Sequence, residues 1–176
     1  ISSSDNSFTT EKEENVNIKT VIIDRIIEEV ETQIKTAEHG RLDALEESKA
    51  HKGAMESRYD TFKEEAQYLA GGFAVRLVEL GKILRALKSI RDYPPTVTKG
   101  SGYAIVGVEN LDDGSKAKYF LLPVGGGNTY EVGGEKITVL NINAPLARAF
   151  IGSVAGDEVE IKIRGTTRRF SIVSVA

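Results

Sequence analysis

The sequence predicts an α+β protein in which an N-terminal antiparallel coiled-coil hairpin precedes a small antiparallel sheet domain with a short helix. Two long stretches carry apolar residues at steps of three and four, which is the pattern of helix-packing seams. Tyr93-Pro94-Pro95 ends this pattern, because consecutive prolines cannot continue a helix. Beyond the prolines, apolar residues alternate with a period of two, which is typical of strands.

The composition is that of an ordinary soluble protein with one large or two small domains: 176 residues, 40% hydrophobic and 28% charged. No run approaches the ~18 apolar residues of a membrane span, so we expect no membrane partner. The absence of cysteine excludes a disulfide framework and favours the reducing cytoplasm. The first residues lack a signal-peptide pattern, and the start at Ile1 instead of Met is expected of a truncated or processed chain.

The charge distribution argues against general affinity for nucleic acid. The net charge is −3, whereas phosphate binding usually needs a concentrated basic surface. Residues 1–91 carry 14 Lys and Arg against 17 Asp and Glu, and residues 92–176 carry 9 of each kind. The acidity therefore belongs to the first half of the chain.

The N-terminal half starts with a polar segment, residues 1–15, which we expect to be a flexible lead-in. The hairpin is expected over residues 16–92, with a first helix from about Asn15–Asn17 to about His51. Its seam consists of Ile23, Ile27, Val30, Ile34 and Ala37. Gly40 costs ~1 kcal/mol relative to Ala inside a helix, which predicts a local kink.

The return helix is expected to begin near Asp60 or Thr61, since either residue is a good N-cap. Its seam consists of Phe73, Leu77, Leu80, Leu84 and Leu87. A turn near Gly53 would bring the two seams together, and we then expect Leu80 and Leu84 to be buried against the region from Val30 to Ile34. A helix of ~30 residues is roughly 45 Å long, so residues 54–68 form the tip of a long hairpin.

The tip carries four acidic residues: Glu56, Asp60, Glu64 and Glu65. Asp60 and Glu64 are four residues apart, so their carboxylates face the same side of a helix. Two such groups can share a hard cation such as Mg²⁺ without holding it tightly alone. The alternative is that these acids only solvate and cap the helix.

The second half divides into a linker at residues 93–101 and a sheet domain at residues 102–176. Five strands are predicted: Gly102–Val108, Lys118–Leu122, Lys136–Asn141, Glu158–Ile163 and Arg169–Val175. A short helix is expected over residues 143–152, capped by Asn143, with Pro145 in its first turn and Gly152 at its exit.

Other chemistry-bearing motifs are better explained by structure. His39 and His51 both lie on the predicted first helix and should face solvent. The glycine runs at 125–127 and 133–134 lack the Gly-Lys-Ser/Thr ending of a phosphate loop and should flank a hairpin. Arg164, Arg168, Arg169 and Phe170 form a small basic and aromatic cluster, which is best interpreted as a solvated strand face.

Two parts of the chain resemble the Gre transcript-cleavage factors, the GreA/GreB family of bacterial RNA polymerase. The more specific part consists of residues 137–141, then Ala144-Pro145-Leu146-Ala147-Arg148-Ala149-Phe150-Ile151-Gly152 and Gly156-Asp157-Glu158-Val159. The tip, Arg58-Tyr59-Asp60-Thr61 followed by Tyr68-Leu69-Ala70, is similar to a divergent branch of Gre-like proteins. The resemblance covers about residues 16–176.

The resemblance implies an N-terminal coiled coil, an FKBP-like C-terminal domain and a non-enzymatic transcription elongation factor. In that family the globular domain docks at the rim of the polymerase secondary channel, and the coiled coil reaches towards the active site. The tip carboxylates then support a second Mg²⁺ held by the polymerase, which cleaves the RNA 3′ end of a backtracked transcript. The factor thus holds no cofactor alone and meets the nascent RNA only indirectly.

By this resemblance Asp60 and Glu64 are the expected metal-facing pair, with Glu56 and Glu65 in reserve. The expected polymerase contacts are Pro145, Leu146, Arg148, Phe150 and Ile151. The tip departs from the family pattern by one additional residue between the acids and by Glu65 in place of Asn. A secondary-channel inhibitor of RNA polymerase on the same scaffold is therefore an alternative, and an FKBP-like prolyl isomerase or chaperone is a third.

Overall fold

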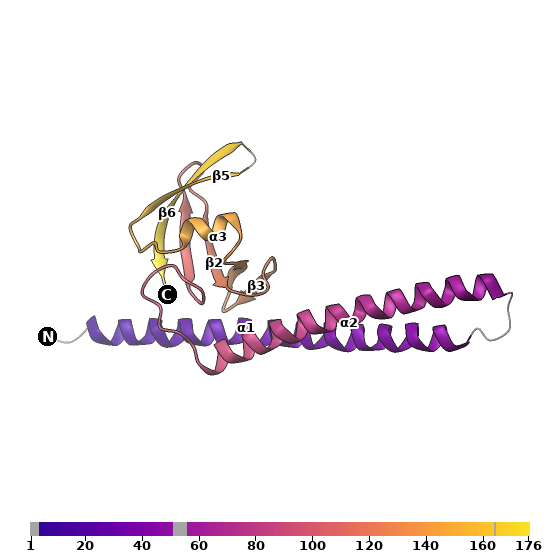
Figure 1. Ribbon diagram of the computed structural model, residues 1–176. Helices are drawn as coiled ribbons and strands as arrows, with labels where there is room; N and C mark the ends of the chain where they lie inside the picture. Colours follow the sequence, from indigo (N-terminus) through magenta and orange to yellow (C-terminus); the bar gives the residue numbers. More distant parts are fainter. Residues whose placement is uncertain (1–3, 51–55, 164) are drawn as a thin grey trace. The chain divides into compact units, whose positions relative to one another are not determined.

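The computed structural model describes residues 4–50, 56–163 and 165–176, with side chains described over 18–49, 60–162 and 165–176. Two long helices precede six strands and a short helix in this described part (Figure 1). The helices are α1 (Ser4–Ala50), α2 (Glu56–Asp92) and α3 (Pro145–Phe150), and the strands are β1 (Ile105–Asn110), β2 (Lys116–Leu122), β3 (Thr129–Val132), β4 (Glu135–Asn141), β5 (Glu158–Ile163) and β6 (Thr166–Val175). The predicted fold class is confirmed.

The chain divides into two compact units. Residues 25–88 form what we call the hairpin unit, and residues 1–24 with 89–176 form the sheet unit. The helices α1 and α2 each pass from one unit into the other. No helix in the described part of the chain is long and apolar enough to cross a lipid bilayer.

In the hairpin unit, α1 and α2 run antiparallel and side by side (Figure 1). Ile27 and Val30 of α1 and Leu80 of α2 are buried, as the seam predicted. The prediction for Leu84 is wrong, because its side chain is only half-buried. Two polar pairs join the helices: Lys88 Nζ donates to Glu31 Oε1 at 2.9 Å, and Arg76 Nη2 donates to Gln33 Oε1 at 3.0 Å.

Both long helices extend further than expected. α1 begins at Ser4, upstream of the expected start near Asn15–Asn17. Propagating a formed helix adds one hydrogen bond per residue and is easier than nucleation, so a polar segment can continue it. α2 already includes Glu56, so Asp60 and Thr61 lie inside the helix and are not its N-caps. The predicted turn at Gly53 and the end of the first helix at His51 lie outside the described residues.

The half of the hairpin unit nearer the tip has a seam of small residues. Ala37 and Ala44 of α1 and Ala66 and Ala70 of α2 are all buried. The predicted kink at Gly40 is wrong, because α1 continues through this residue as one helix. The absence of a side chain at Gly40 leaves space for the end of the Phe73 ring. We thus distinguish a tip half with an alanine seam from a base half with larger aliphatic side chains.

The six strands form one sheet in the order β3-β4-β2-β1-β6-β5. Neighbouring strands are antiparallel except β2 and β4, which are parallel with Phe120 opposite Val139. Strand β3 was not among the predicted strands. A hairpin is present here, but the second glycine run is its turn and does not flank it. Gly133 and Gly134 form its turn with φ of 62° and 79°, which is the geometry of a two-residue hairpin connection.

Strand β1 starts later than predicted because a turn precedes it. Ala104 N donates to the carbonyl of Ser101 at 3.0 Å, and Tyr103 adopts a φ of 81°. The register of β1 against β6 then shifts between Gly107 and Val108. The strand consequently runs from Ile105 to Asn110, three residues beyond the predicted Gly102 start.

One hydrophobic core lies between α3 and the sheet. Phe150 of α3 is fully buried, stacks on Tyr119 with ring centroids 5.6 Å apart and meets Phe170 edge-on at 5.9 Å. Ala147 is also fully buried, and Val106 and Leu121 belong to the same cluster. This core fixes α3 on the sheet.

The first part of α1 belongs to the sheet unit and contacts it through Lys19. The Lys19 Nζ lies 4.6 Å from the centroid of the Tyr103 ring, and the Lys19 residue is 4% exposed. Burial lowers the pKa of Lys19 to about 8, because removing water destabilises the ammonium form. In the same unit, Arg91 Nη1 of α2 pairs with Asp24 Oδ1 of α1 at 3.2 Å.

Candidate functional site

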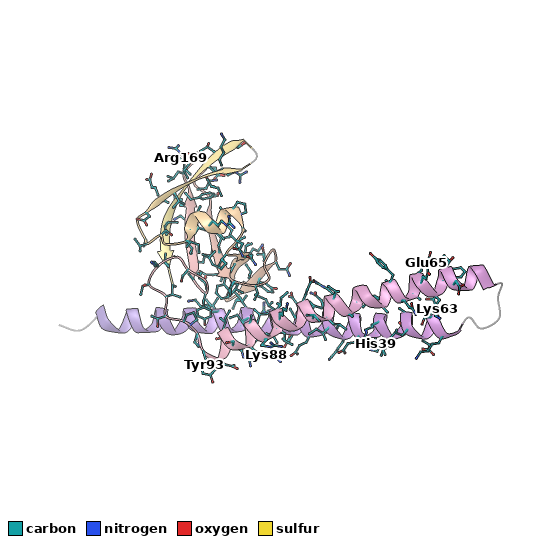
Figure 2. All side chains as sticks on the ribbon, viewed as in Figure 1. His39, Lys63, Glu65, Lys88, Tyr93 and Arg169 are labelled. Carbon is teal, nitrogen blue, oxygen red and sulfur yellow. The ribbon has the colours of Figure 1, made fainter. Side chains whose placement is uncertain are left out.

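The predicted acidic tip is partly described by the structure. Asp60, Glu64 and Glu65 are exposed on α2, and Asp60 and Glu64 are one helical turn apart. Figure 2 shows Lys63 and Glu65 towards the opposite end of α2 from Lys88. Nothing is described of the Glu56 side chain. The helix thus carries at least three solvent-facing carboxylates in its first three turns.

The capping explanation does not fit Asp60. An N-cap residue precedes the first helical residue and accepts a hydrogen bond from the backbone N–H groups of the first turn. Asp60 follows Glu56 by four residues and lies within α2, where those N–H groups are bonded along the helix. Its carboxylate is therefore not needed for the start of the helix.

Asp60 and Glu64 provide the oxygen donors that Mg²⁺ prefers, but too few of them. Mg²⁺ requires near-octahedral coordination and releases its waters reluctantly. The described residues contain no group of three or more His, Cys, Asp or Glu side chains that could hold a metal ion. Asp60 and Glu64 alone therefore do not form a complete Mg²⁺ site.

Large apolar side chains near the tip were missed by the sequence reasoning. Phe62, Tyr68 and Leu69 are 53%, 87% and 52% exposed, while Ala66 and Ala70 between and beside them are buried. A signal was present, because the alanines at 66 and 70 continue the spacing of the seam and leave the large residues off it. The tip half thus buries methyl groups and exposes aromatic and aliphatic ones.

The second predicted site lies around α3, and the structure divides its residues. Pro145 and Arg148 are exposed, Leu146 is half-buried, and Ile151 is 46% exposed. Phe150, which we predicted as a partner contact, is 0% exposed and cannot reach a partner. Sequence reasoning also missed Val154, which is 45% exposed. We call the exposed set Pro145, Arg148, Ile151 and Val154 the α3 corner.

Backbone contacts fix the turn after α3. Gly152 N donates to the Gly100 carbonyl at 2.7 Å, and Gly100 N donates to the Ser153 carbonyl at 2.8 Å. The Ser153 hydroxyl donates to the Phe150 carbonyl at 2.7 Å. A Cβ at Gly100 would lie 1.8 Å from the Phe150 carbonyl oxygen, so only glycine fits there. Sequence reasoning placed Gly100 in the linker and gave it no role.

The Gly156-Asp157 pair closes the same corner. Gly156 has a φ of 97°, and its N–H donates to the Ile172 carbonyl at 2.8 Å. Asp157 Oδ2 accepts a hydrogen bond from Val154 N at 2.9 Å. The predicted cap is wrong, since Ala144 is the N-cap of α3, and Asn143 N instead donates to Asn141 Oδ1 at 2.9 Å. The Gly156-Asp157 pair and the turn after α3 therefore belong to one corner of the sheet unit.

The remaining motifs have structural explanations. His39 is exposed as predicted, and His51 lies outside the described residues. Arg168 and Arg169 are exposed, with Arg169 Nη2 3.7 Å from Asp112 Oδ1, whereas Arg164 lies outside the described residues. Asp113 accepts hydrogen bonds from the Ser115 side chain and backbone, which lower the pKa of its carboxyl group.

Comparison with known proteins shows similarity over most of the chain. The family model described as "Transcription elongation factor, GreA/GreB, C-term" matches residues 101–176. A transcription elongation factor GreA of Cereibacter sphaeroides is 30% identical over 173 residues, covering 96% of this chain and 95% of the relative. That of Polaromonas naphthalenivorans is 29% identical over 140 residues, covering 76% and 80%.

Among solved structures, the GreA factor homolog 1 (Gfh1) protein of Thermus thermophilus aligns with a TM-score of 0.36 and 13% identity, over 85% of this chain and 94% of that chain. The chain is a transcription elongation factor, because its match to the GreA relative covers nearly the full length of both proteins. The fold consists of a helical hairpin followed by a sheet with a short helix. The chain belongs to the GreA/GreB family.

Proposed function

We propose that this chain binds RNA polymerase and stimulates cleavage of backtracked transcripts. The observation that carries the proposal is the exposure of Asp60 and Glu64, one helical turn apart, towards one end of the hairpin unit. The span from Asp60 to Lys88 is about 40 Å at 1.5 Å per residue. A two-helix unit of that length is narrow enough to enter a channel and long enough to bring carboxylates to a buried active site.

In this mechanism the chain supplies ligands and position. Asp60 and Glu64 are the residues that would hold an Mg²⁺ ion jointly with the polymerase, and Glu56 and Glu65 are reserves. A second metal ion, when bound, stabilises the attacking and leaving oxygens of phosphodiester hydrolysis. The carboxylates contribute more inside a channel than in water, because a lower effective dielectric strengthens the attraction of opposite charges.

The α3 corner is the proposed docking surface at the rim of the channel. Arg148 offers a charge, and Ile151 and Val154 offer exposed apolar surface next to it in the chain. The hydrogen bonds to Gly100 and Asp157 hold this surface in one conformation, which limits the entropy lost on binding. Docking there raises the effective concentration of the tip at the active site.

The isolated chain is then expected to be an accessory factor without cleavage activity. Two exposed carboxylates do not hold Mg²⁺ alone, so titration of the free protein should give no measurable binding. The prolyl isomerase alternative finds little support at α3, because the Phe150 ring occupies the space between that helix and the sheet. Turnover of a proline peptide by the isolated chain would revive it.

The test is a transcript-cleavage assay on stalled elongation complexes. Asp60→Asn and Glu64→Gln keep the shape of each side chain and remove its charge. Each should abolish stimulated cleavage while polymerase binding persists, and added Mg²⁺ should partly restore activity. Glu38→Gln is the matched control, because Glu38 is an exposed acid on α1 outside the tip.

Two results would contradict the proposal. If both tip variants cleave as well as the wild type, the carboxylates only solvate the helix. If the wild type slows elongation at every Mg²⁺ concentration and never shortens a backtracked transcript, the chain is a secondary-channel inhibitor.

A further inference from the structure

The ring of Phe73 on α2 ends against the backbone of Gly40 on α1. A Cβ atom built on Gly40 would lie 2.5 Å from Cζ of Phe73, and 2.9 Å and 3.0 Å from Cε1 and Cε2. Cβ atoms essentially never approach other atoms so closely, so the ring occupies the position that any side chain at residue 40 would need. Both residues lie within the hairpin unit and are half-buried.

At this contact a large ring on α2 meets a glycine on α1, whereas the neighbouring buried residues of the tip half are alanines. Ala37 and Ala44 lie one turn to either side of Gly40 on α1, and Ala66 and Ala70 precede Phe73 on α2. Helix register is set when a large side chain enters a hole in the facing helix. Sliding the helices by one turn, 5.4 Å, would move the ring from the Cα of Gly40 onto a Cβ.

We propose that Gly40 and Phe73 are positioning residues that lock the register of the tip half and thereby place Asp60 and Glu64. We call this pair the register lock. The expected effect of this pair on the distance between the two helices follows from the contact between Gly40 and Phe73 alone. Its effect on transcript cleavage rests on the function proposed above.

A small disturbance of the lock is enlarged at the tip. An alanine at residue 40 needs an ordinary contact distance of 3.4–4 Å instead of 2.5 Å, so the ring must retreat by about 1 Å. Leu80 is the next fully buried layer of α2 and lies about 10 Å from Phe73, while Asp60 lies about 30 Å from Leu80. Where the α2 backbone follows the ring instead of the ring turning aside, a pivot at Leu80 converts a shift of about 1 Å at Phe73 into about 3 Å at Asp60.

The first experiment measures the helix-to-helix distance without polymerase. The chain has no cysteine, so spin labels attach only to introduced cysteines. The exposed positions Glu46 and Gln67 report on the tip half, and the exposed positions Glu28 and Arg85 report on the base half. Gly40→Ala should lengthen the mean Glu46–Gln67 label distance by about 1–3 Å, Gly40→Leu should lengthen it further, and the Glu28–Arg85 distance should stay unchanged.

Matched controls separate the contact from helix propensity. Gly71→Ala and Gly81→Ala make the same chemical change within α2, and a Cβ at either position meets no atom within 4 Å. They should leave both label distances unchanged. Adding Phe73→Leu to Gly40→Ala removes the end of the ring and should restore the wild-type tip distance. The register lock is wrong if Gly40→Ala gives the same tip distance as Gly71→Ala, or if Phe73→Leu does not reverse the shift.

The second experiment measures stimulated cleavage and polymerase binding. A misplacement of about 1 Å can cost about 100-fold in rate, so Gly40→Ala should lose about 100-fold in cleavage with unchanged binding. The double variant with Gly40→Ala and Phe73→Leu should recover most of that loss in cleavage rate. A shifted tip with full cleavage would overturn the positioning role. If the wild type stimulates no cleavage at all, the proposed function fails, and the label distances alone decide the register lock.

Discussion

The α3 corner and the tip half of the hairpin unit present their exposed side chains in contrasting ways. Behind Ile151 and Val154 lie the fully buried Phe150 and three backbone hydrogen bonds to Gly100 and Ser153. Behind Asp60 and Glu64 lies a seam of alanines, with Ala66 and Ala70 7% and 6% exposed. The burial of a Phe contributes about 1.5–3 kcal/mol, whereas each methyl group contributes about 0.8 kcal/mol.

This difference separates two kinds of sensitivity. At the α3 corner, buried residues beneath the surface, such as Phe150 and Gly100, hold the sheet unit together, so substitutions of those residues change stability. At the tip, the surface residues contribute little to folding, so substitutions there change position and charge while the chain stays folded.

Phe150→Ala should lower the free energy of unfolding of the sheet unit by about 3–5 kcal/mol, because it empties the space between α3 and Tyr119. Urea denaturation followed by tyrosine fluorescence measures the change. The control is Ile151→Ala at the next residue, which is 46% exposed and should cost much less. Equal costs for the two variants would contradict the proposed division between core and contact surface.

Leu80→Ala should cost about 2–5 kcal/mol in the hairpin unit, because Leu80 is 1% exposed. Leu84→Ala should cost less than Leu80→Ala, since Leu84 is half-buried and loses fewer contacts. Helical circular dichroism against urea concentration measures both. A larger cost for Leu84 than for Leu80 would place the base-half seam on another face of α2.

The ion pair between Lys88 and Glu31 should contribute about 0.2–1 kcal/mol, because both side chains are 44% exposed and partly hydrated. A double-mutant cycle with Lys88→Met and Glu31→Gln isolates this coupling. Raising the salt concentration to 1 M should reduce the coupling, since screening weakens exposed pairs. A coupling above about 2 kcal/mol at high salt would show that the base half depends on charge more than on its apolar seam.

Arg148→Glu should change stability by less than about 0.5 kcal/mol, because Arg148 is exposed on α3. The same change should weaken polymerase binding, since it reverses a charge on the proposed docking surface. Competition binding to polymerase measures the effect, and Lys99→Glu, an exposed residue in the linker, is a charge-matched control. Unchanged affinity of Arg148→Glu would move the docking surface away from the α3 corner.

Long repeating patterns were readable from the sequence, and short ones were not. The seam through Ile27, Val30 and Leu80 spans many turns, so its period was clear and its residues are buried. Strand β3 has four residues, and α3 has six. Neither is long enough for a period to show which side chains face inward, so the pattern of α3 did not correct the expectation, drawn from the family resemblance, that Phe150 contacts a partner.

The site itself depends on contacts between distant residues, which a single sequence does not display. Gly40 and Phe73 are 33 residues apart, and nothing local distinguishes Gly40 from the exposed Gly71. Gly100 faces the Phe150 carbonyl across 50 residues. The acidic tip was recognisable because Asp60 and Glu64 are one helical turn apart in the sequence itself.

The strand order leaves two open edges on the sheet, and both discourage aggregation. β3 forms one edge and has only four residues, between the glycine runs at 125–127 and 133–134. β5 forms the other edge and exposes Glu158, Glu160 and Lys162. Short strands and charged side chains both oppose the pairing of an edge with a strand of another molecule. The sheet unit is thereby protected from joining copies of itself through continuous β-sheet, a route to aggregation that does not depend on its apolar core.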